Sequence, residues 1–101
     1  MDEIDKLVDL VVKEGASDLH FEEDRVPLIR VAGQLVPLTK YPKFSKSIME
    51  SVLNSMLSPI KKQSFKETLS ADCAYLHKGE RFRGHIFIEQ GRMCAAFRHI
   101  S

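Results

Sequence analysis

Residues 81–100 near the end of the sequence contain four arginines, Arg92 and the three named next, and guanidinium groups suit the binding of oxyanions. Arg81 and Arg83 precede the dipeptide Gln90-Gly91, and Arg98 follows it. Apolar and polar residues alternate on both sides of this dipeptide, which predicts a β-hairpin over residues 81–100. With a two-residue turn, Arg83 faces Arg98. Like charges opposite each other destabilise a sheet, so we expect an anion to neutralise them.

The length of this turn decides whether the arginines share a face. A two-residue turn also puts Arg81 on their face, with His85, Ala96 and Ile100, and it leaves the other face to apolar residues such as Phe82, Ile86 and Phe97. A three-residue turn over residues 90–92 slips the register by one. Arg83 and Arg98 then lie on opposite faces and cannot share one phosphate.

Asp18 and His20 form a second group of residues capable of chemistry. The alternation over residues 16–22 predicts a strand with Leu19 and Phe21 on one face and Asp18, His20 and Glu22 on the other. As a metal site the pair is at least one ligand short. We favour the reading that both are satisfied by hydrogen bonds near the start of the strand. No clustered His/Cys pattern indicates a metal site.

The remaining patterns predict the elements that position these residues. Helical spacing predicts a helix over residues 2–13, one that starts after Ser45, and one that starts at Ser58-Pro59. The last of these is expected to bury Ile60, Phe65 and Leu69. Short apolar runs predict strands over 27–31, 35–38 and 71–76, with a turn over 32–34. The order is helix, three strands, two helices, three strands, which is an α+β pattern with an antiparallel sheet of about six strands.

Composition narrows the class of protein. The 101 residues are 44% hydrophobic, enough to bury the core of one domain, and the net charge of +1 does not indicate a nucleic-acid-binding surface. No apolar run approaches the roughly 18 residues of a membrane-spanning helix, and the acidic start is unlike a signal peptide. Cys73 and Cys94 read as reduced thiols. Neither GxxxxGK(S/T) nor GxSxG is present, so the chain does not read as an enzyme on its own.

An ordered set of motifs resembles the N-terminal domain of PilT-type ATPases. The set is Ala16-Ser17-Asp18-Leu19-His20, then Arg30-x-x-Gly33-x-Leu35, then Arg81-Phe82-Arg83 and Phe97-Arg98-x-Ile100. These ATPases retract type IV pili and are members of the secretion ATPase superfamily, with the PilB-like assembly motors and the GspE-like secretion motors. The resemblance covers essentially the whole chain. The start of the domain near residue 1 favours the retraction branch.

The resemblance implies a PAS-like domain over residues 1–101, followed after residue 101 by a RecA-like ATPase domain with the Walker motifs. It implies a homohexamer that uses ATP and Mg and works on an inner-membrane pilus platform protein, from the cytoplasmic face of the bacterial membrane. Because the phosphate loop is absent from these residues, we expect no tight nucleotide binding by this chain and no activity of the chain alone. The expected partners are the ATPase domain and neighbouring subunits.

The resemblance also gives the arginines a role. Arg83 and Arg98 match the arginines that reach the phosphates of ATP as arginine fingers, and Arg81 is a possible further phosphate contact. The chain departs from the family at Asp24-Arg25-Val26-Pro27, where a Gly-x-Pro-Pro turn is usual. It departs again at Gly84-His85, where an apolar residue and Asn are usual.

Two other functions stay open at this point. The same residues are compatible with a stand-alone PAS-like sensor or interaction module, and with the equivalent domain of a pilus-assembly or type II secretion ATPase. Continuation of the reading frame into a phosphate loop separates the first from the motor domains.

Overall fold

The computed structural model describes residues 2–100. In chain order its elements are α1 (Asp2–Glu14), β1 (Asp18–Glu22), β2 (Leu28–Val31), β3 (Gln34–Pro37), α2 (Lys46–Met56), α3 (Pro59–Thr68), β4 (Ser70–His77), β5 (Glu80–Glu89) and β6 (Arg92–Ile100). This order and the α+β class confirm the prediction from sequence. None of these helices is long and apolar enough to cross a membrane.

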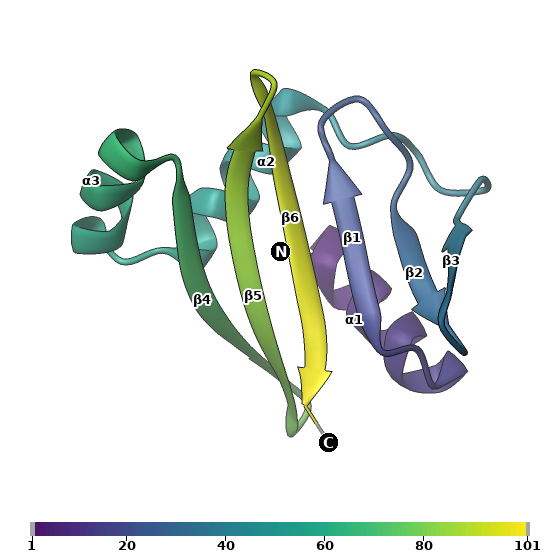
Figure 1. Cartoon of the computed structure of the whole chain (residues 1–101). Coiled ribbons are helices and arrows are strands. Elements are labelled where there is room, and N and C mark those ends of the chain that lie inside the picture. The colour runs from purple at the N-terminus through teal and green to yellow at the C-terminus, as the bar shows by residue number, and fades with distance from the viewer. Residues whose placement is uncertain (1, 101) are drawn as a thin grey trace.

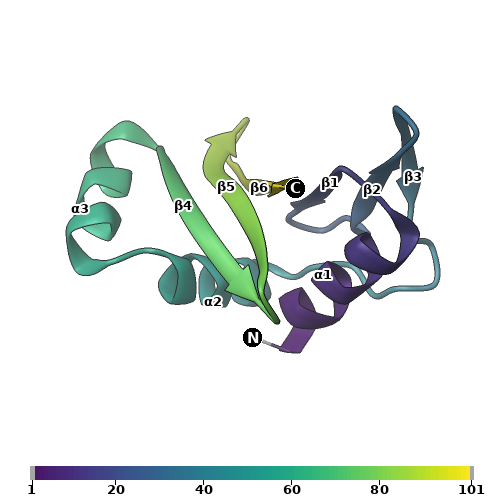
Figure 2. The same cartoon turned by 90° about the horizontal axis from the view of Figure 1, so that it is seen from below.

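All six strands form one antiparallel sheet in the order β3-β2-β1-β6-β5-β4. The two three-strand runs therefore meet where β1 pairs with β6, in the middle of the sheet (Figure 1). Seen from below, α1 and α2 lie on one side of the sheet, and no helix of residues 2–100 covers the other side (Figure 2). This uncovered face presents the outward-facing side chains of β1, β5 and β6.

The core lies between the sheet and the helices α1 and α2. In α1, β1, β5 and β6 the large buried side chains are those that the apolar periodicity predicts, because only one face of a helix or strand can be buried against a neighbouring layer. The fully buried large side chains on the sheet include Leu19, Phe21, Phe82, Ile86 and Phe97. The helices add Ile4, Leu7, Val8 and Val11 from α1 and Met49 from α2. Phe21 and Phe97 stack across the β1–β6 pair with ring centroids 5.6 Å apart.

Both internal helices begin at the serines expected to cap them. The Ser45 hydroxyl accepts a hydrogen bond from the Ile48 amide at 3.1 Å, and the Ser58 hydroxyl accepts one from the Lys61 amide at 3.3 Å. Each bond satisfies an amide that has no partner inside its helix. Pro59 occupies the first helical position of α3, where its missing N–H costs nothing.

The predicted buried face of α3 is wrong at two of its three residues. Phe65 is 7% exposed, whereas Ile60 is 82% and Leu69 is 49% exposed. The helix packs beside the edge strand β4 rather than over the sheet, so it has a neighbour on one narrow side only (Figure 1). Leu69 also leaves the helix, since it ends α3 in the left-handed conformation with φ of 62°.

The β2–β3 connection is one residue shorter than predicted. Ala32 and Gly33 alone form the turn, both with positive φ, and Gln34 already pairs with Val31. The third strand therefore starts at Gln34 instead of residue 35. In the stretch Asp24-Arg25-Val26-Pro27, where the sequence departs from the family pattern, Asp24 has φ of 65°, a conformation that Asp tolerates better than most residues.

Candidate functional site

The turn at Gln90-Gly91 contains two residues, and this settles the register of the hairpin. Both residues have positive φ, 51° and 77°, which is the geometry whose twist matches a two-stranded ribbon. Glu89 pairs with Arg92. The predicted two-residue register is confirmed, and the three-residue alternative is excluded.

Arg83 and Arg98 therefore lie directly opposite each other on β5 and β6. Both side chains are exposed on the uncovered face, while Gly84 and Phe97, their neighbours in sequence, face the core. Arg81 is also exposed, but it pairs with Ile100. Two residues along a strand correspond to about 7 Å, so Arg81 lies one row away from the other two arginines.

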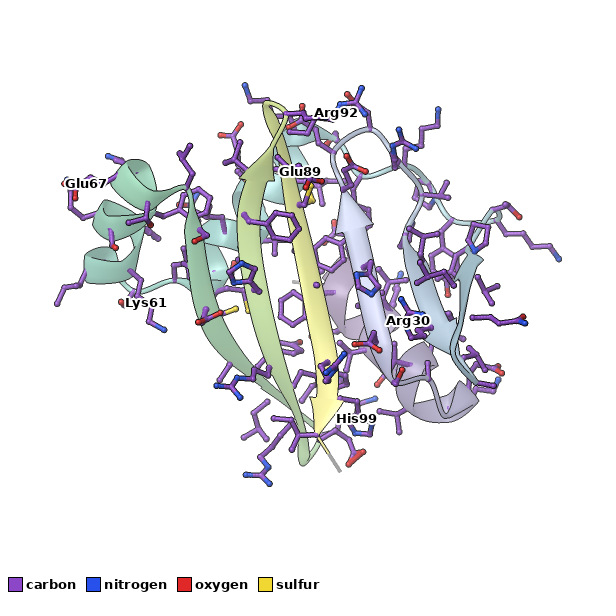
Figure 3. All side chains as sticks on the ribbon, in the orientation of Figure 1. Arg30, Lys61, Glu67, Glu89, Arg92 and His99 are labelled. Atoms are coloured by element: carbon purple, nitrogen blue, oxygen red, sulfur yellow. The ribbon has the colours of Figure 1, made fainter. Side chains whose placement is uncertain are left out.

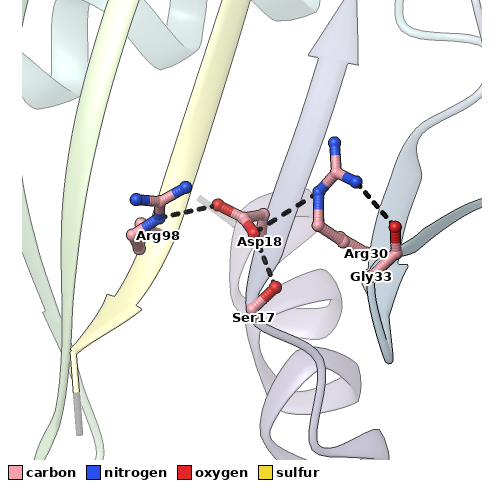
Figure 4. A network of polar contacts seen from close by, with 5 residues as sticks. All are labelled: Ser17, Asp18, Arg30, Gly33 and Arg98. Atoms are coloured by element: carbon pink, nitrogen blue, oxygen red, sulfur yellow. Dashed lines mark hydrogen bonds and ion pairs between the residues drawn. The ribbon is translucent and has the colours of Figure 1, made fainter.

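Asp18 supplies an anion that the sequence analysis did not assign to the arginines. It pairs with Arg98 in the β1–β6 register, and its Oδ1 accepts a hydrogen bond from Arg98 Nε at 3.0 Å. On its other side, Oδ2 lies 3.8 Å from Arg30 Nε and accepts a 2.6 Å hydrogen bond from the Ser17 hydroxyl (Figure 4). Arg98 thus has an anionic partner within the domain itself.

The expectation of satisfied hydrogen bonds at Asp18 is confirmed. Burial raises the pKa of this carboxyl, but the hydrogen bonds from Ser17 and Arg98 and the charge of Arg98 outweigh burial, so the pKa lies below its ordinary value. Asp18 is therefore ionised at neutral pH. The same network fixes Arg30, whose Nη1 donates to the Gly33 carbonyl at 2.9 Å.

For His20 the same expectation is wrong. Its Nε2 is buried and has no hydrogen-bond partner in the part of the chain described. Burial lowers the pKa of His20, and the charges of Arg30 and Arg98 lower it further against the opposing effect of Asp18. The imidazole is thus neutral at pH 7, with its buried Nε2 left without a hydrogen-bond partner among the described residues.

A cavity of about 260 Å³ lies over this part of the uncovered face. It spans β4, β5, β6 and β1, and Ala96 lies at its centre in the register, between His85 on β5 and His20 on β1. The lining residues are Asp18, His20, Asp72, Arg83, Gly84, His85, Ala96, Phe97 and Arg98. Arg83 and Arg98 thus border one cavity together, whereas Arg81 does not line it.

The second carboxylate at the cavity, Asp72, is also paired. Its Oδ1 lies 2.8 Å from Nδ1 of His85, the residue opposite it in the sheet. Arg83 has no such partner among the ion pairs of residues 2–100. One row across the sheet holds three guanidinium groups, those of Arg30, Arg98 and Arg83, and one carboxylate, that of Asp18. This row therefore keeps a net positive charge. Such a row can hold an oxyanion.

The same residues do not make a metal centre. Within residues 2–100 no group of three or more His, Cys, Asp or Glu side chains is placed to hold a metal ion. The cysteines are not paired with each other: Cys73 and Cys94 are free and buried, and burial raises the pKa of both thiols.

Sequence comparison finds two relatives, and no family model matches the chain. The type IV pilus ATPase PilU of Pseudomonas aeruginosa is 30% identical over 99 residues, which is 97% of this chain and 26% of PilU. The retraction ATPase PilT of the same organism is 29% identical over 99 residues, which is 28% of PilT. The crystal structure of the pilus retraction motor PilT with bound ADP superposes with a TM-score of 0.84 at 25% identity, over 97% of this chain.

The chain matches the N-terminal domain of a PilT-type ATPase.

This match confirms the resemblance found from sequence motifs. The ATPase DotB of Legionella pneumophila, at 18% identity and a TM-score of 0.81, has the same fold over 97% of this chain. The chain spans about a quarter of the length of PilU and PilT. It therefore corresponds to one domain of a secretion or pilus ATPase, with the arginine pair on the uncovered face of that domain's sheet.

Proposed function

We propose that this chain is the N-terminal domain of a hexameric ATPase that powers type IV pilus retraction, and that Arg83 and Arg98 contact the γ-phosphate of ATP bound by a RecA-like domain. The observation that carries the proposal is their placement directly opposite each other, on an uncovered sheet face, at the border of one cavity. The relative with the highest TM-score given above is a retraction motor whose crystal structure contains ADP.

The chemistry of phosphoryl transfer supports this role. Negative charge spreads over the oxygens of the transferred phosphoryl group, and positioned guanidinium groups stabilise that charge. Arg98 uses only Nε in its contact with Asp18, and Arg83 has no ion pair among the described residues, so both keep terminal N–H donors for a phosphate. Arg81 is assigned a weaker part, a contact to phosphate from the next row of the sheet.

The proposal includes the setting of the domain. A RecA-like domain after residue 101 binds ATP and Mg, six subunits assemble, and hydrolysis changes the angle between the two domains. The motor works in the cytoplasm at the inner face of the membrane, against the pilus platform protein. Similarity to PilU and PilT supports this branch, and the equivalent domain of an assembly or secretion ATPase is the second candidate.

Arg83→Ala in the full-length protein is the cleanest test, because this side chain has no ion pair with any of residues 2–100 to lose. We expect kcat for ATP hydrolysis to fall about 10²- to 10³-fold while hexamers stay intact, which is the range for removing a donor that stabilises transition-state charge. Arg98→Ala is expected to do the same, with unfolding measured in parallel because the change also leaves buried Asp18 without its partner. Arg81→Ala should lower kcat less than either of these two substitutions.

Arg92→Ala is the matched control. Arg92 is exposed and is the first residue of β6, next to the turn (Figure 3). Arg98 lies near the other end of the same strand. It does not line the cavity of the arginine pair. Its removal should leave kcat unchanged. Wild-type turnover in both Arg83→Ala and Arg98→Ala hexamers would show that the arginine-finger assignment is wrong.

A further inference from the structure

The carboxylate of Asp18 is held more firmly than any other acidic group at the cavity. Its side chain is 8% exposed, and each of its oxygens has a partner. Ser17 donates to Oδ2 from the preceding residue, and Arg30 approaches the same oxygen from β2. A buried charge with several partners has little freedom to move. Asp18 is thus a fixed point against which a mobile side chain can be oriented.

Arg98 is the exposed side chain that this carboxylate contacts from β6. It is 75% exposed, and Asp18 engages only its Nε. Figure 4 shows the contact on the inner edge of the guanidinium, with the two terminal nitrogens not joined to Asp18. Arg30 differs, because its Nη1 is committed to the Gly33 carbonyl as well. Of the two arginines on Asp18, Arg98 is therefore the one that keeps both terminal amino groups for a ligand.

We propose that Asp18 is the positioning residue for Arg98, holding the guanidinium by Nε so that its terminal N–H groups meet a phosphate of ATP. The inference rests on the proposed role of Arg98. A free arginine must lose rotamer freedom when it binds a phosphate, and a carboxylate that already restricts Nε reduces that loss. Asp18 does not compete with the phosphate for the terminal N–H groups of Arg98, because its Oδ1 engages only Nε and its Oδ2 is held by Ser17 and Arg30. The row as a whole stays positive.

The test is a double-mutant cycle on ATP hydrolysis by the full-length protein. Asp18→Asn keeps the size of the side chain and one acceptor oxygen but removes the charge. In the wild-type background we expect kcat to fall about tenfold or more, as for misplacement of a catalytic group, with little change in KM for ATP. In the Arg98→Ala background the same substitution should change kcat little, because its target is gone.

Each outcome separates the positioning role from the arginine-finger role. If Arg98→Ala is impaired but Asp18→Asn has wild-type or higher kcat, the positioning role is wrong and the arginine-finger role stands. Equal losses from Asp18→Asn in both backgrounds identify a structural residue and also overturn the inference. If Arg98→Ala has no effect, both the finger role and the positioning role fail.

A second measurement on the 101-residue chain tests the contact without ATP hydrolysis. In ¹⁵N NMR spectra the Arg98 Nε–H should exchange with water several-fold faster in Asp18→Asn than in wild type, because a charge-assisted hydrogen bond is weakened. The Arg92 Nε–H is the internal reference and should not change. Equal exchange rates of the Arg98 Nε–H in Asp18→Asn and wild type overturn the proposed contact.

Discussion

Gly84 offers the sharpest test of how the sheet behind the arginines is packed. It pairs with Cys73 on one side and Phe97 on the other, and all three face the core. A methyl group at Gly84 would lie 2.7 Å from Cys73 Sγ and 2.7 Å from Phe97 Cε2. Carbon contacts are ordinarily about 3.5–4.0 Å, so alanine is too close to both neighbours at once.

Gly84→Ala should therefore destabilise the domain by about 1–2 kcal/mol. Overpacking a core costs about 1–3 kcal/mol. Replacing a strand glycine returns about 0.5–1 kcal/mol of backbone entropy, because its φ does not need glycine. Urea unfolding followed by circular dichroism measures the difference. With a slope of about 2 kcal/mol per molar urea, the middle of the usual range, the midpoint should fall by roughly 0.5–1 M.

Cys73→Ala provides the control, since it removes one of the two crowded atoms. The cost of Gly84→Ala should be smaller in that background by at least about 0.5 kcal/mol, the coupling expected for residues in contact. Gly84→Ala that raises stability instead, as an unobstructed strand glycine should, would contradict the packing argument. The substitution also bears on the site, because a shifted β5 moves Arg83, the preceding residue.

Two further predictions concern α3 and the cavity. Phe65→Ala should cost about 3–5 kcal/mol in urea unfolding and Ile60→Ala less than about 0.5 kcal/mol, since only Phe65 is buried; similar losses would mean that α3 packs by a different face. The pKa of His20 is lowered, so the unfolded chain binds this proton more readily, and the stability that the neutral ring contributes is complete above about pH 6.5 and declines as the pH falls through that value. The free energy of unfolding should fall less between pH 7 and pH 5 in His20→Gln than in wild type. Parallel profiles of stability against pH in the two proteins would refute the lowered pKa of His20.

The hairpin that carries Arg83 and Arg98 was predictable because its information is local. Gln90-Gly91 adopts the two positive φ angles of a two-residue turn, and the alternation on either side fixes which residues face the core. The helix starts at Ser45 and Ser58 are local in the same way, since a cap bonds to an amide three residues away. Arg81, by contrast, shared the predicted face but not the cavity.

The other half of the site was not predictable from patterns along the chain. Asp18 and Arg98 are 80 residues apart and meet only because β1 pairs with β6. The same holds for His20, which loses its hydrogen-bond partners only when neighbouring strands bury it. An alternating pattern shows that a strand has a polar face, but it does not say which strand lies beside it.

The motif set and the alternation in the sequence thus predicted the kind of domain, the order of its elements and, if the turn has two residues, a pair of arginines that face each other. The tertiary structure added the carboxylate that holds one of them, the crowding of Gly84 and the exposed position of Ile60. These features depend on which elements become neighbours when the whole chain packs. Turns, caps and strand periodicity come from contacts a few residues apart, whereas side-chain partners and burial come from contacts between distant segments.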